Sequence, residues 1–193
     1  MFPPARIYRS VLPLCLTSFL LAPLSGMPVS AGQQPAVMPP VVLDDATAWI
    51  RRGLASNAAG RYQEALEAFL QAVAIDPGNS FALFNLGTTS ALMGRYREAA
   101  GYLEQAVRIA PDLLPAWGNL GAMYNHLDQP AEALAAFRQV LRLQPGNADA
   151  HYQAALALLA LGRRDEACAE YEALLSLDPQ LAEKLLPALR DRK

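Results

Sequence analysis

Cysteine and histidine are scarce in this chain, whose 193 residues include two of each. His126 and His151 are widely separated in the sequence, and no cysteine or carboxylate stands near them at the spacing of a metal-binding motif. A glycine-rich phosphate loop and a Gly-x-Ser-x-Gly turn are also missing from the sequence. Because catalysis needs converging nucleophiles, acids, bases or metal ligands, we predict that the protein is not an enzyme and uses no cofactor and no metal.

Positive charge is sparse as well. The chain has 16 lysine and arginine residues against 18 aspartate and glutamate residues, and its formal net charge is −2. The basic residues form no patch or stripe of the kind that follows a phosphate backbone. We therefore expect no nucleic acid partner. Since no catalytic or cofactor motif is present, we expect no small-molecule substrate either.

The N-terminal segment differs from the rest of the chain. Arg6 and Arg9 precede an apolar run over residues 11–24, and small residues follow it, ending at Ala31. This order is typical of a secretory signal peptide, and the run is shorter than the roughly 20 residues that a membrane-spanning helix needs. We predict a signal peptide over residues 1–31, cleaved after Ala31, which makes the protein periplasmic or secreted. The alternative is an uncleaved N-terminal anchor, the one case in which we expect a membrane contact.

Residues 32–45 form a proline-rich segment that we interpret as a linker. Its last two residues, Asp44 and Asp45, each offer a side chain that caps a helix start well. The first helix is therefore expected to begin at residue 46.

An internal period runs through the sequence beyond the linker. A proline ends each period, and a Glu-Ala pair precedes each proline at a constant distance, with no insertion or deletion. The four prolines stand at equal intervals, at Pro77, Pro111, Pro145 and Pro179. Recurrence in phase at this length indicates an internal structural repeat.

Apolar residues within each unit have helical spacing. In the third unit, one helix face is formed at i, i+3, i+4 and i+7 by Trp117, Leu120, Gly121 and Tyr124. A second such face follows around Phe137, with a turn between the two. The closing proline cannot continue the second helix. Each unit is thus predicted to be helix, turn, helix, and such a unit buries its apolar face only by stacking on its neighbours.

At this point the sequence resembles the tetratricopeptide repeat family. The pattern Trp-x2-Leu-Gly-x2-Tyr, then Ala-x3-Phe, then Pro is complete in the third unit, as Trp117, Leu120, Gly121, Tyr124, Ala133, Phe137 and Pro145. The resemblance implies an all-α fold, a right-handed α-solenoid of four helix-turn-helix repeats of about 34 residues each, whose first helices line a concave groove. The repeats are expected at residues 46–79, 80–113, 114–147 and 148–181, and residues 182–193 are expected to form a C-terminal cap or a tail.

Two glycines of the third unit need different explanations, since glycine costs about 1 kcal/mol relative to alanine inside a helix. Gly121 occupies a small-residue slot that holds Gly53, Gly87 and Ala155 in the other units. We predict that it lets the two helices of a repeat approach closely, so that a larger side chain would clash. Gly118 lies outside this slot, and we predict that it leaves a gap in the groove beside Asn119.

Polar side chains recur on the face that would line the groove. One slot holds Arg51, Asn85, Asn119 and Gln153. In peptide-binding members of the family that the sequence resembles, an Asn at this slot often holds the ligand backbone, since an amide both donates and accepts. Neighbouring positions add Phe81, Phe84, Asn125, His126 and Tyr152 to the predicted peptide-binding groove. The alternatives are that the aromatic side chains contact the adjacent repeat, and that the amides are solvated or cap helices.

The groove lacks the cations that family members use to clamp an acidic chaperone tail, since Ile50, Pro115 and Asn119 stand where basic residues would be expected. The resemblance therefore favours an exported, non-catalytic scaffold that binds a peptide segment or partner protein in its concave groove, within a bacterial envelope complex. The alternative is a self-associating structural subunit of an envelope assembly or secretion system, anchored by an uncleaved N-terminus.

Cys168 is the one cysteine outside the predicted signal peptide. Its repeat slot holds Leu66, Ala100 and Leu134 in the other units. We therefore predict that Cys168 is a small buried hydrophobic residue. The alternative is a reactive thiol.

Overall fold

The computed structural model describes residues 45–190, and the fold is described for this range. It contains helices and no strand within these residues, so the predicted all-α fold is confirmed. The predicted signal peptide, and the linker except for Asp45, lie outside the described residues. The helices are α1 (Ala46–Ala58), α2 (Tyr62–Ile75), α3 (Ser80–Leu92), α4 (Tyr96–Ile109), α5 (Leu114–His126), α6 (Pro130–Leu143), α7 (Ala148–Ala160), α8 (Arg164–Leu177) and α9 (Pro179–Arg190).

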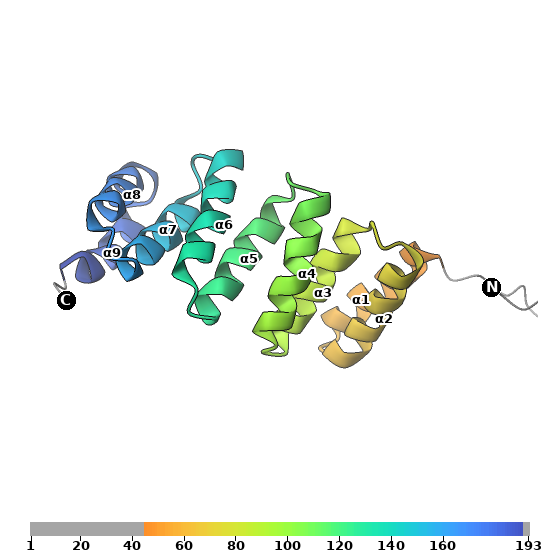
Figure 1. The fold of residues 1–193 in the computed structure, drawn as a ribbon. Helices are drawn as coiled ribbons and strands as arrows, with labels where there is room; N and C mark the ends of the chain where they lie inside the picture. The colour runs from red at the N-terminus through yellow and green to blue at the C-terminus, as the bar shows by residue number, and fades with distance from the viewer. Residues whose placement is uncertain (1–44, 191–193) are drawn as a thin grey trace, which may run out of the picture. The chain divides into compact units, whose positions relative to one another are not determined.

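The helices form a repeat solenoid in which each packs against the next (Figure 1). Four pairs, α1 with α2 through α7 with α8, are called units one to four below. Each second helix also contacts the first helix of the following unit, and α3 contacts α5 directly. Apolar faces that a single unit leaves open are therefore buried between units, as expected for stacked repeats.

The first helices begin with side-chain caps in three of the four units. Asp45, Asn79 and Asn147 each accept a hydrogen bond from the backbone N–H three residues on, at 2.7, 2.9 and 2.9 Å respectively. The expected cap at Asp45 is therefore confirmed. In unit three the position belongs to Leu113, which cannot cap, and Pro115 stands in the first turn instead. Proline suits this turn because its missing N–H has no partner within the helix anyway.

The turn between the two helices of a unit requires a left-handed backbone. Gly60, Gly94 and Gly162 have φ angles of 73°, 74° and 73°. Glycine adopts this conformation readily because it has no Cβ atom. Unit three uses Asp128 with φ 56° at the corresponding point, and Asp is one of the few other residues that visit this region routinely.

The small-residue slot lies where the two helices of a unit meet. A Cβ atom added at Gly121 would stand 2.7 Å from Cζ of Phe137, and one added at Gly53 would stand 2.6 Å from Cε1 of Phe69. Both rings are buried, with 4% and 0% of their surface exposed. The predicted clash is therefore confirmed, and these glycines set the distance between paired helices.

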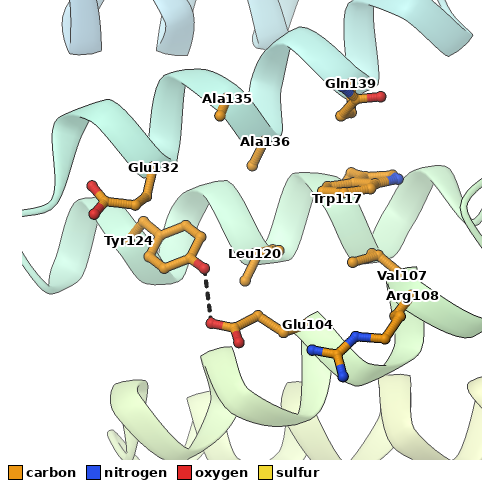
Figure 2. Close-up of a pocket in the computed structure, with 10 residues that line it drawn as sticks. All are labelled: Glu104, Val107, Arg108, Trp117, Leu120, Tyr124, Glu132, Ala135, Ala136 and Gln139. Atoms are coloured by element: carbon orange, nitrogen blue, oxygen red, sulfur yellow. Dashed lines mark hydrogen bonds between the residues drawn. The ribbon is translucent and has the colours of Figure 1, made fainter.

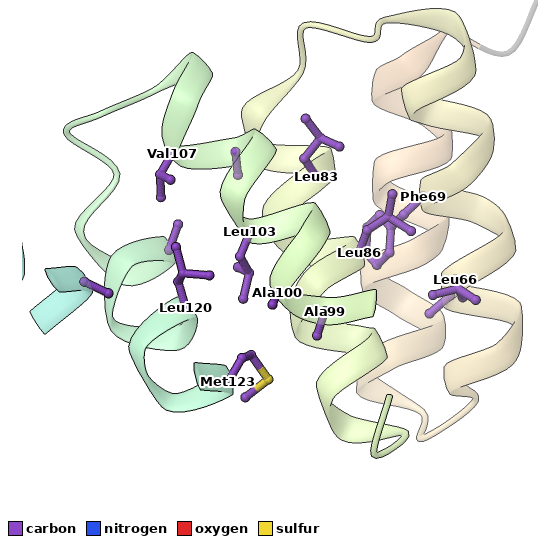
Figure 3. Close-up of a cluster of buried hydrophobic side chains, with 14 residues drawn as sticks. Leu66, Phe69, Leu83, Leu86, Ala99, Ala100, Leu103, Val107, Leu120 and Met123 are labelled. Atoms are coloured by element: carbon purple, nitrogen blue, oxygen red, sulfur yellow. The ribbon is translucent and has the colours of Figure 1, made fainter. Parts of the chain in front are cut away.

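Two clusters of buried hydrophobic side chains run along the stack. The first spans units one to three and the second spans units three and four, while Tyr124 packs against both. Figure 3 shows the first cluster, in which side chains from successive units interleave between the helices. Its largest members are Leu66, Phe69, Leu83, Leu86, Leu103 and Leu120. The core is thus shared between units rather than enclosed within one.

Helix α9 follows unit four with a different geometry. Earlier second helices are followed by four-residue links, whereas a single residue, Asp178, separates α8 from α9. Helix α9 packs against α7 and α8, burying Ala182 and Leu185 completely, and it contains Pro187. It therefore does not start a fifth repeat in register.

Cys168 is exposed, so the prediction of a buried side chain is wrong. Its counterparts Leu66, Ala100 and Leu134 are buried because the first helix of a following unit packs against each second helix. Helix α9 begins too soon after α8 to take that position. The same face of α8 exposes Leu175, with 49% of its surface accessible.

Candidate functional site

The nine predicted groove residues all lie on the first helices α1, α3, α5 and α7. Their exposure differs: Arg51, Phe81, Asn125 and His126 are exposed, Phe84, Asn119, Tyr152 and Gln153 are half-buried, and Asn85 is buried. The structure therefore places them on one set of helices but does not bring them all to one site.

Asn85 faces inward more than the repeat pattern predicts, with 7% of its surface exposed. Its side-chain Nδ2 donates to the carbonyl oxygen of Phe81 at 2.7 Å, one turn back on α3. The backbone carbonyl oxygen of Asn85 accepts a hydrogen bond from Oγ1 of Thr89 at 2.7 Å. Asn85 therefore uses one amide hydrogen inside its own helix, whose N-cap is Asn79, so it is neither solvated nor a helix cap.

Amide side chains on the first helices bridge neighbouring units. Nδ2 of Asn119 donates to Oγ1 of Thr88 at 3.2 Å, and Nδ2 of Asn125 donates to Oε1 of Gln153 at 3.2 Å. Units one and two are joined in the same way, by Asn57 Nδ2 donating to Oγ1 of Thr89 at 2.8 Å. We call these three hydrogen bonds the amide bridges.

A hollow of about 300 Å³ lies between α5 and α7, with residues of α6 at its floor. Gly118, Asn119 and Gln153 line it, as do Pro115 and Asp149. A Cβ atom added at Gly118 would meet nothing within 4 Å, so the predicted gap beside Asn119 is confirmed. Of the nine predicted groove residues, Asn119 and Gln153 are the two that line this hollow.

The hollow offers one acceptor and one donor that the protein does not use itself. Asn119 engages its Nδ2 in an amide bridge, and Gln153 engages its Oε1 in another. Within the described residues, Oδ1 of Asn119 and Nε2 of Gln153 make no hydrogen bond. A peptide backbone presents N–H donors and C=O acceptors, so these two atoms suit it chemically.

The aromatic residues predicted for the groove are divided between surface and core. Phe81 has 46% of its surface exposed, whereas Phe84 packs against the first hydrophobic cluster and Tyr152 against the second. Contact with neighbouring helices, the alternative considered for these side chains, therefore accounts for Phe84 and Tyr152. Of these three aromatic residues, Phe81 is the one that exposes a large apolar surface on α3.

Both histidines make contacts that stabilise the repeat. The ring of His126 stacks on Tyr96, with centroids 4.2 Å apart and planes 8° from parallel. His151 lies 2.9 Å from the carbonyl oxygen of Pro145 through Nε2 and 2.6 Å from Glu170 through Nδ1. Trp117, one unit earlier, donates from its indole to the carbonyl of Pro111 at 2.9 Å. His151 thus replaces the tryptophan in the same hydrogen bond.

Sequence reasoning missed the hydroxyl partners of the amides, Thr88 and Thr89. Both lie on α3, three and four residues after Asn85 and therefore about one turn along the helix. A pair of threonines inside a predicted helix was the available signal, because threonine has low helix propensity and its hydroxyl often bonds back to the preceding turn.

The described part of the chain offers neither a metal site nor a membrane span. Residues 45–190 contain no group of three or more His, Cys, Asp or Glu side chains placed to hold a metal ion. No helix in that range is long and apolar enough to cross a membrane.

Comparison with family models gives two matches, each described as a tetratricopeptide repeat. They cover residues 44–112 and residues 126–186. A search of curated proteins found no match.

Several solved structures share the fold. A crystal structure of MamA protein is 26% identical with a TM-score of 0.67, covering 70% of this chain and 74% of that one. YrrB, described as a TPR protein with an unusual peptide-binding site, is 24% identical with a TM-score of 0.66, covering 70% of each chain. The first TPR of Spaghetti (RPAP3), bound to the HSP90 peptide SRMEEVD, is 23% identical with a TM-score of 0.59, covering 62% of this chain and 94% of that one.

Proposed function

Because the chain belongs to the tetratricopeptide repeat family, we propose that it is a non-catalytic scaffold that binds an extended peptide segment of a partner protein across its first helices. One observation carries this proposal. The hollow between α5 and α7 presents an unused acceptor on Asn119 and an unused donor on Gln153, one repeat apart. Extended peptides bind through such main-chain hydrogen bonds, and side-chain pockets add specificity.

The chemistry of the hollow restricts the ligand. Asp149 is the one charged residue among the described residues that line it. The HSP90 peptide bound to RPAP3 contains three acidic residues, and the hollow here offers no lysine or arginine to hold such a peptide. We therefore propose that the bound segment is uncharged or basic where it crosses α5 and α7.

The N-terminal sequence supports a proposal about the compartment. We propose that the chain is exported, that residues 1–31 are removed after Ala31, and that the protein serves a bacterial envelope complex in the periplasm or outside the cell. Mass spectrometry of the protein recovered from its host tests the export step. A mature N-terminus at Gly32 is expected, and an intact chain held in the membrane fraction would support the anchored alternative instead.

The binding proposal is tested with peptides selected from a displayed random library against the purified chain. Gly118→Phe should fill the hollow and weaken the selected peptides by at least about tenfold, since it places a ring where the ligand would lie. The Asn119→Ala and Gln153→Ala double variant should weaken them by a similar factor through loss of two hydrogen bonds. Affinity that survives both changes rules out this hollow as the binding site.

Gly101 provides the matched control. A Cβ atom added there also meets nothing within 4 Å, but Gly101 lies on the second helix α4, away from the hollow. Gly101→Phe should therefore leave the affinity of the selected peptides unchanged. A loss equal to that of Gly118→Phe would show that the effect is not local.

A second candidate function is self-association through the uncovered face of α8, which exposes Cys168 and Leu175. These residues lie seven apart, about two helical turns, so they share one face. Light scattering of the purified chain tests this candidate. A concentration-dependent dimer that Leu175→Glu abolishes would support it, and a monomer at high concentration would remove it.

A further inference from the structure

A larger pocket, with a volume of about 430 Å³, lies on the other side of α5 between α4 and α6 (Figure 2). Trp117, Leu120 and Tyr124 form the part contributed by α5. At about 100° per residue, the mean direction of these three side chains is roughly 180° around the helix axis from the mean direction of Gly118 and Asn119, which line the hollow. The pocket and the hollow share no lining residue. We call it the outer pocket.

One lining residue of the outer pocket is small in unit three and large in both neighbouring units. Ala136 lines it, while the same slot holds Tyr102 in unit two and Glu170 in unit four. Tyr102 packs against the hydrophobic cluster beside it. Glu170 contacts His151 at 2.6 Å, so its side chain reaches from α8 to α7. The side chain of Ala136 is too short to make contacts like those of Tyr102 and Glu170, so the space beside it stays open.

Two carboxylates stand at one end of the pocket. Figure 2 shows Glu104 and Glu132 on either side of Tyr124, while Trp117 lies at the opposite end. The hydroxyl of Tyr124 donates to Oε1 of Glu104 at 2.8 Å. Burial, the hydrogen bond to Glu104 and the nearby charges of both glutamates raise the pKa of Tyr124 to about 12. Arg108 also lines the pocket, but within the described residues it forms no ion pair with either glutamate.

Unit four shows what is missing from this arrangement. Arg138 and Glu166 occupy the slots that hold Glu104 and Glu132 one unit earlier. Nη2 of Arg138 donates to Oε2 of Glu166 at 3.1 Å, joining α6 to α8. Between α4 and α6 the cation of this pair is replaced by a second acid. A cation supplied from outside would therefore restore across the outer pocket the pairing that α6 and α8 make with their own residues.

We infer that the outer pocket binds a lysine or arginine side chain presented by an extended segment of a partner protein. Its charged head lies at the end of the pocket formed by Glu104, Tyr124 and Glu132, and its aliphatic stem runs over Leu120 toward Trp117. The indole is held in place by its hydrogen bond to the carbonyl of Pro111, and its face offers apolar surface on which the aliphatic stem packs. A volume of about 430 Å³ lies within the range of pockets that enclose small ligands. This site is independent of the hollow between α5 and α7.

The test is a nuclear magnetic resonance titration of the isotope-labelled chain with short blocked peptides. Acetyl-Gly-Arg-Gly-amide and acetyl-Gly-Lys-Gly-amide are the probes, and the same peptide with norleucine supplies a neutral stem of similar length. The cationic peptides should shift the indole signal of Trp117 and the amide signals of Ala135 and Ala136 in a saturable way. The norleucine peptide should shift them far less. Equal shifts from charged and neutral peptides would overturn the inference.

Two variants separate the pocket from general electrostatics. Glu104→Gln combined with Glu132→Gln should weaken the arginine peptide by roughly tenfold or more, because two charge-assisted contacts are lost. Glu172→Gln is the control, since Glu172 occupies the slot of Glu104 in the last unit and is exposed. The inference fails if the control weakens binding as much as the double variant does.

Ala136→Tyr fills the outer pocket with the residue that unit two already carries in this slot. It should abolish the cationic shifts while leaving the amide spectrum of the other units and the peptide affinity of the hollow unchanged. If the cationic peptides instead shift Gly118 and Asn119, and still do so in Ala136→Tyr, then Asp149 in the hollow binds the cation. That outcome would refute cation binding in the outer pocket and would leave the proposed peptide binding in the hollow unaffected.

Discussion

Replacing Gly118 with alanine should stabilise the fold, whereas the same replacement at Gly121, on the next turn of α5, should not. Alanine is favoured over glycine inside a helix by about 1 kcal/mol, and this term applies equally to both positions. At Gly118 the added Cβ atom meets nothing within 4 Å. The free energy of unfolding should therefore rise by about 0.5–1 kcal/mol in Gly118→Ala.

The Cβ atom of Gly121→Ala would stand 2.7, 2.8 and 2.9 Å from three ring carbons of Phe137. Real side chains do not approach this closely, so the ring or the helix must move. Overpacking a buried site costs about 1–3 kcal/mol, which cancels or exceeds the gain in helix propensity. Unit four shows the accommodated form, because it has Ala155 in the glycine slot and its Tyr171, in the slot of Phe137, is half-buried rather than buried.

Urea unfolding followed by circular dichroism measures both variants against the parent chain. The free energies of unfolding of the two variants should differ by the overpacking cost of about 1–3 kcal/mol, seen as a shift of the urea midpoint with unchanged slopes. Gly101→Ala serves as a second open-space control, since its added Cβ atom also meets nothing within 4 Å. Equal stabilisation of Gly118→Ala and Gly121→Ala would refute the view that Gly121 sets the distance between α5 and α6.

Three further outcomes follow from individual residues. The thiol of Cys168 should react with a labelling reagent in the folded protein at the rate of an exposed cysteine, since the side chain is exposed; protection in the folded state would show that α8 is covered in solution. The pKa of Tyr124 is raised from 10.0 to about 12, so its contribution to stability is present below pH 10 and is lost as the pH rises toward about 12. A difference absorbance titration against Tyr124→Phe should show this late transition, and Glu104→Gln should move it to lower pH. Gly94→Ala should lower the free energy of unfolding by about 1–2 kcal/mol, because φ is 74° at this turn; an unchanged urea midpoint would contradict that reason.

The fold could be predicted from the repeat period, because residues that recur at a constant spacing occupy equivalent positions in stacked helical units. The equal intervals between the prolines fixed the slots of Gly121 and Phe137 relative to each other, and the clash between them appears in the structure. The gap at Gly118 was likewise readable, since it depends only on which face of one helix carries a residue. The clash involves two helices of a single unit, where the sequence offset determines the geometry.

Features that involve neighbouring units were harder to predict. Asn85 shares a slot with Asn119, yet it is buried and bonded within α3, while Asn119 reaches Thr88 in the preceding unit. Whether an amide faces outward depends on the side chains of both adjacent helices. The slot pattern for Cys168 failed for a related reason, because it assumed a following unit in register and α9 does not provide one.

The outer pocket was not predicted from the sequence. Its lining comes from three helices, and it exists because Ala136 has no large side chain to fill the space. Glu104 and Glu132 are far apart in the sequence, and nothing in either surrounding segment marks them as neighbours. The signal lay in comparing units slot by slot. Tyr102, Ala136 and Glu170 share one slot but differ in size and charge, and Arg138 stands in the slot that holds an acid at Glu104.

The hydrogen bonds between units have a mechanical consequence. Each of the three junctions has one amide bridge between first helices, and a second polar contact that reaches from a second helix into the next unit. The second contacts join Gln63 to Arg95, Glu104 to Tyr124 and Arg138 to Glu166. A bend that separates the helices joined by either contact must lengthen that contact, so the two contacts of a junction together oppose a change in the angle between neighbouring units. In the binding that we propose, a partner that demands a different angle between units would lengthen these contacts, and its affinity would therefore depend on the bend it requires as well as on its side chains.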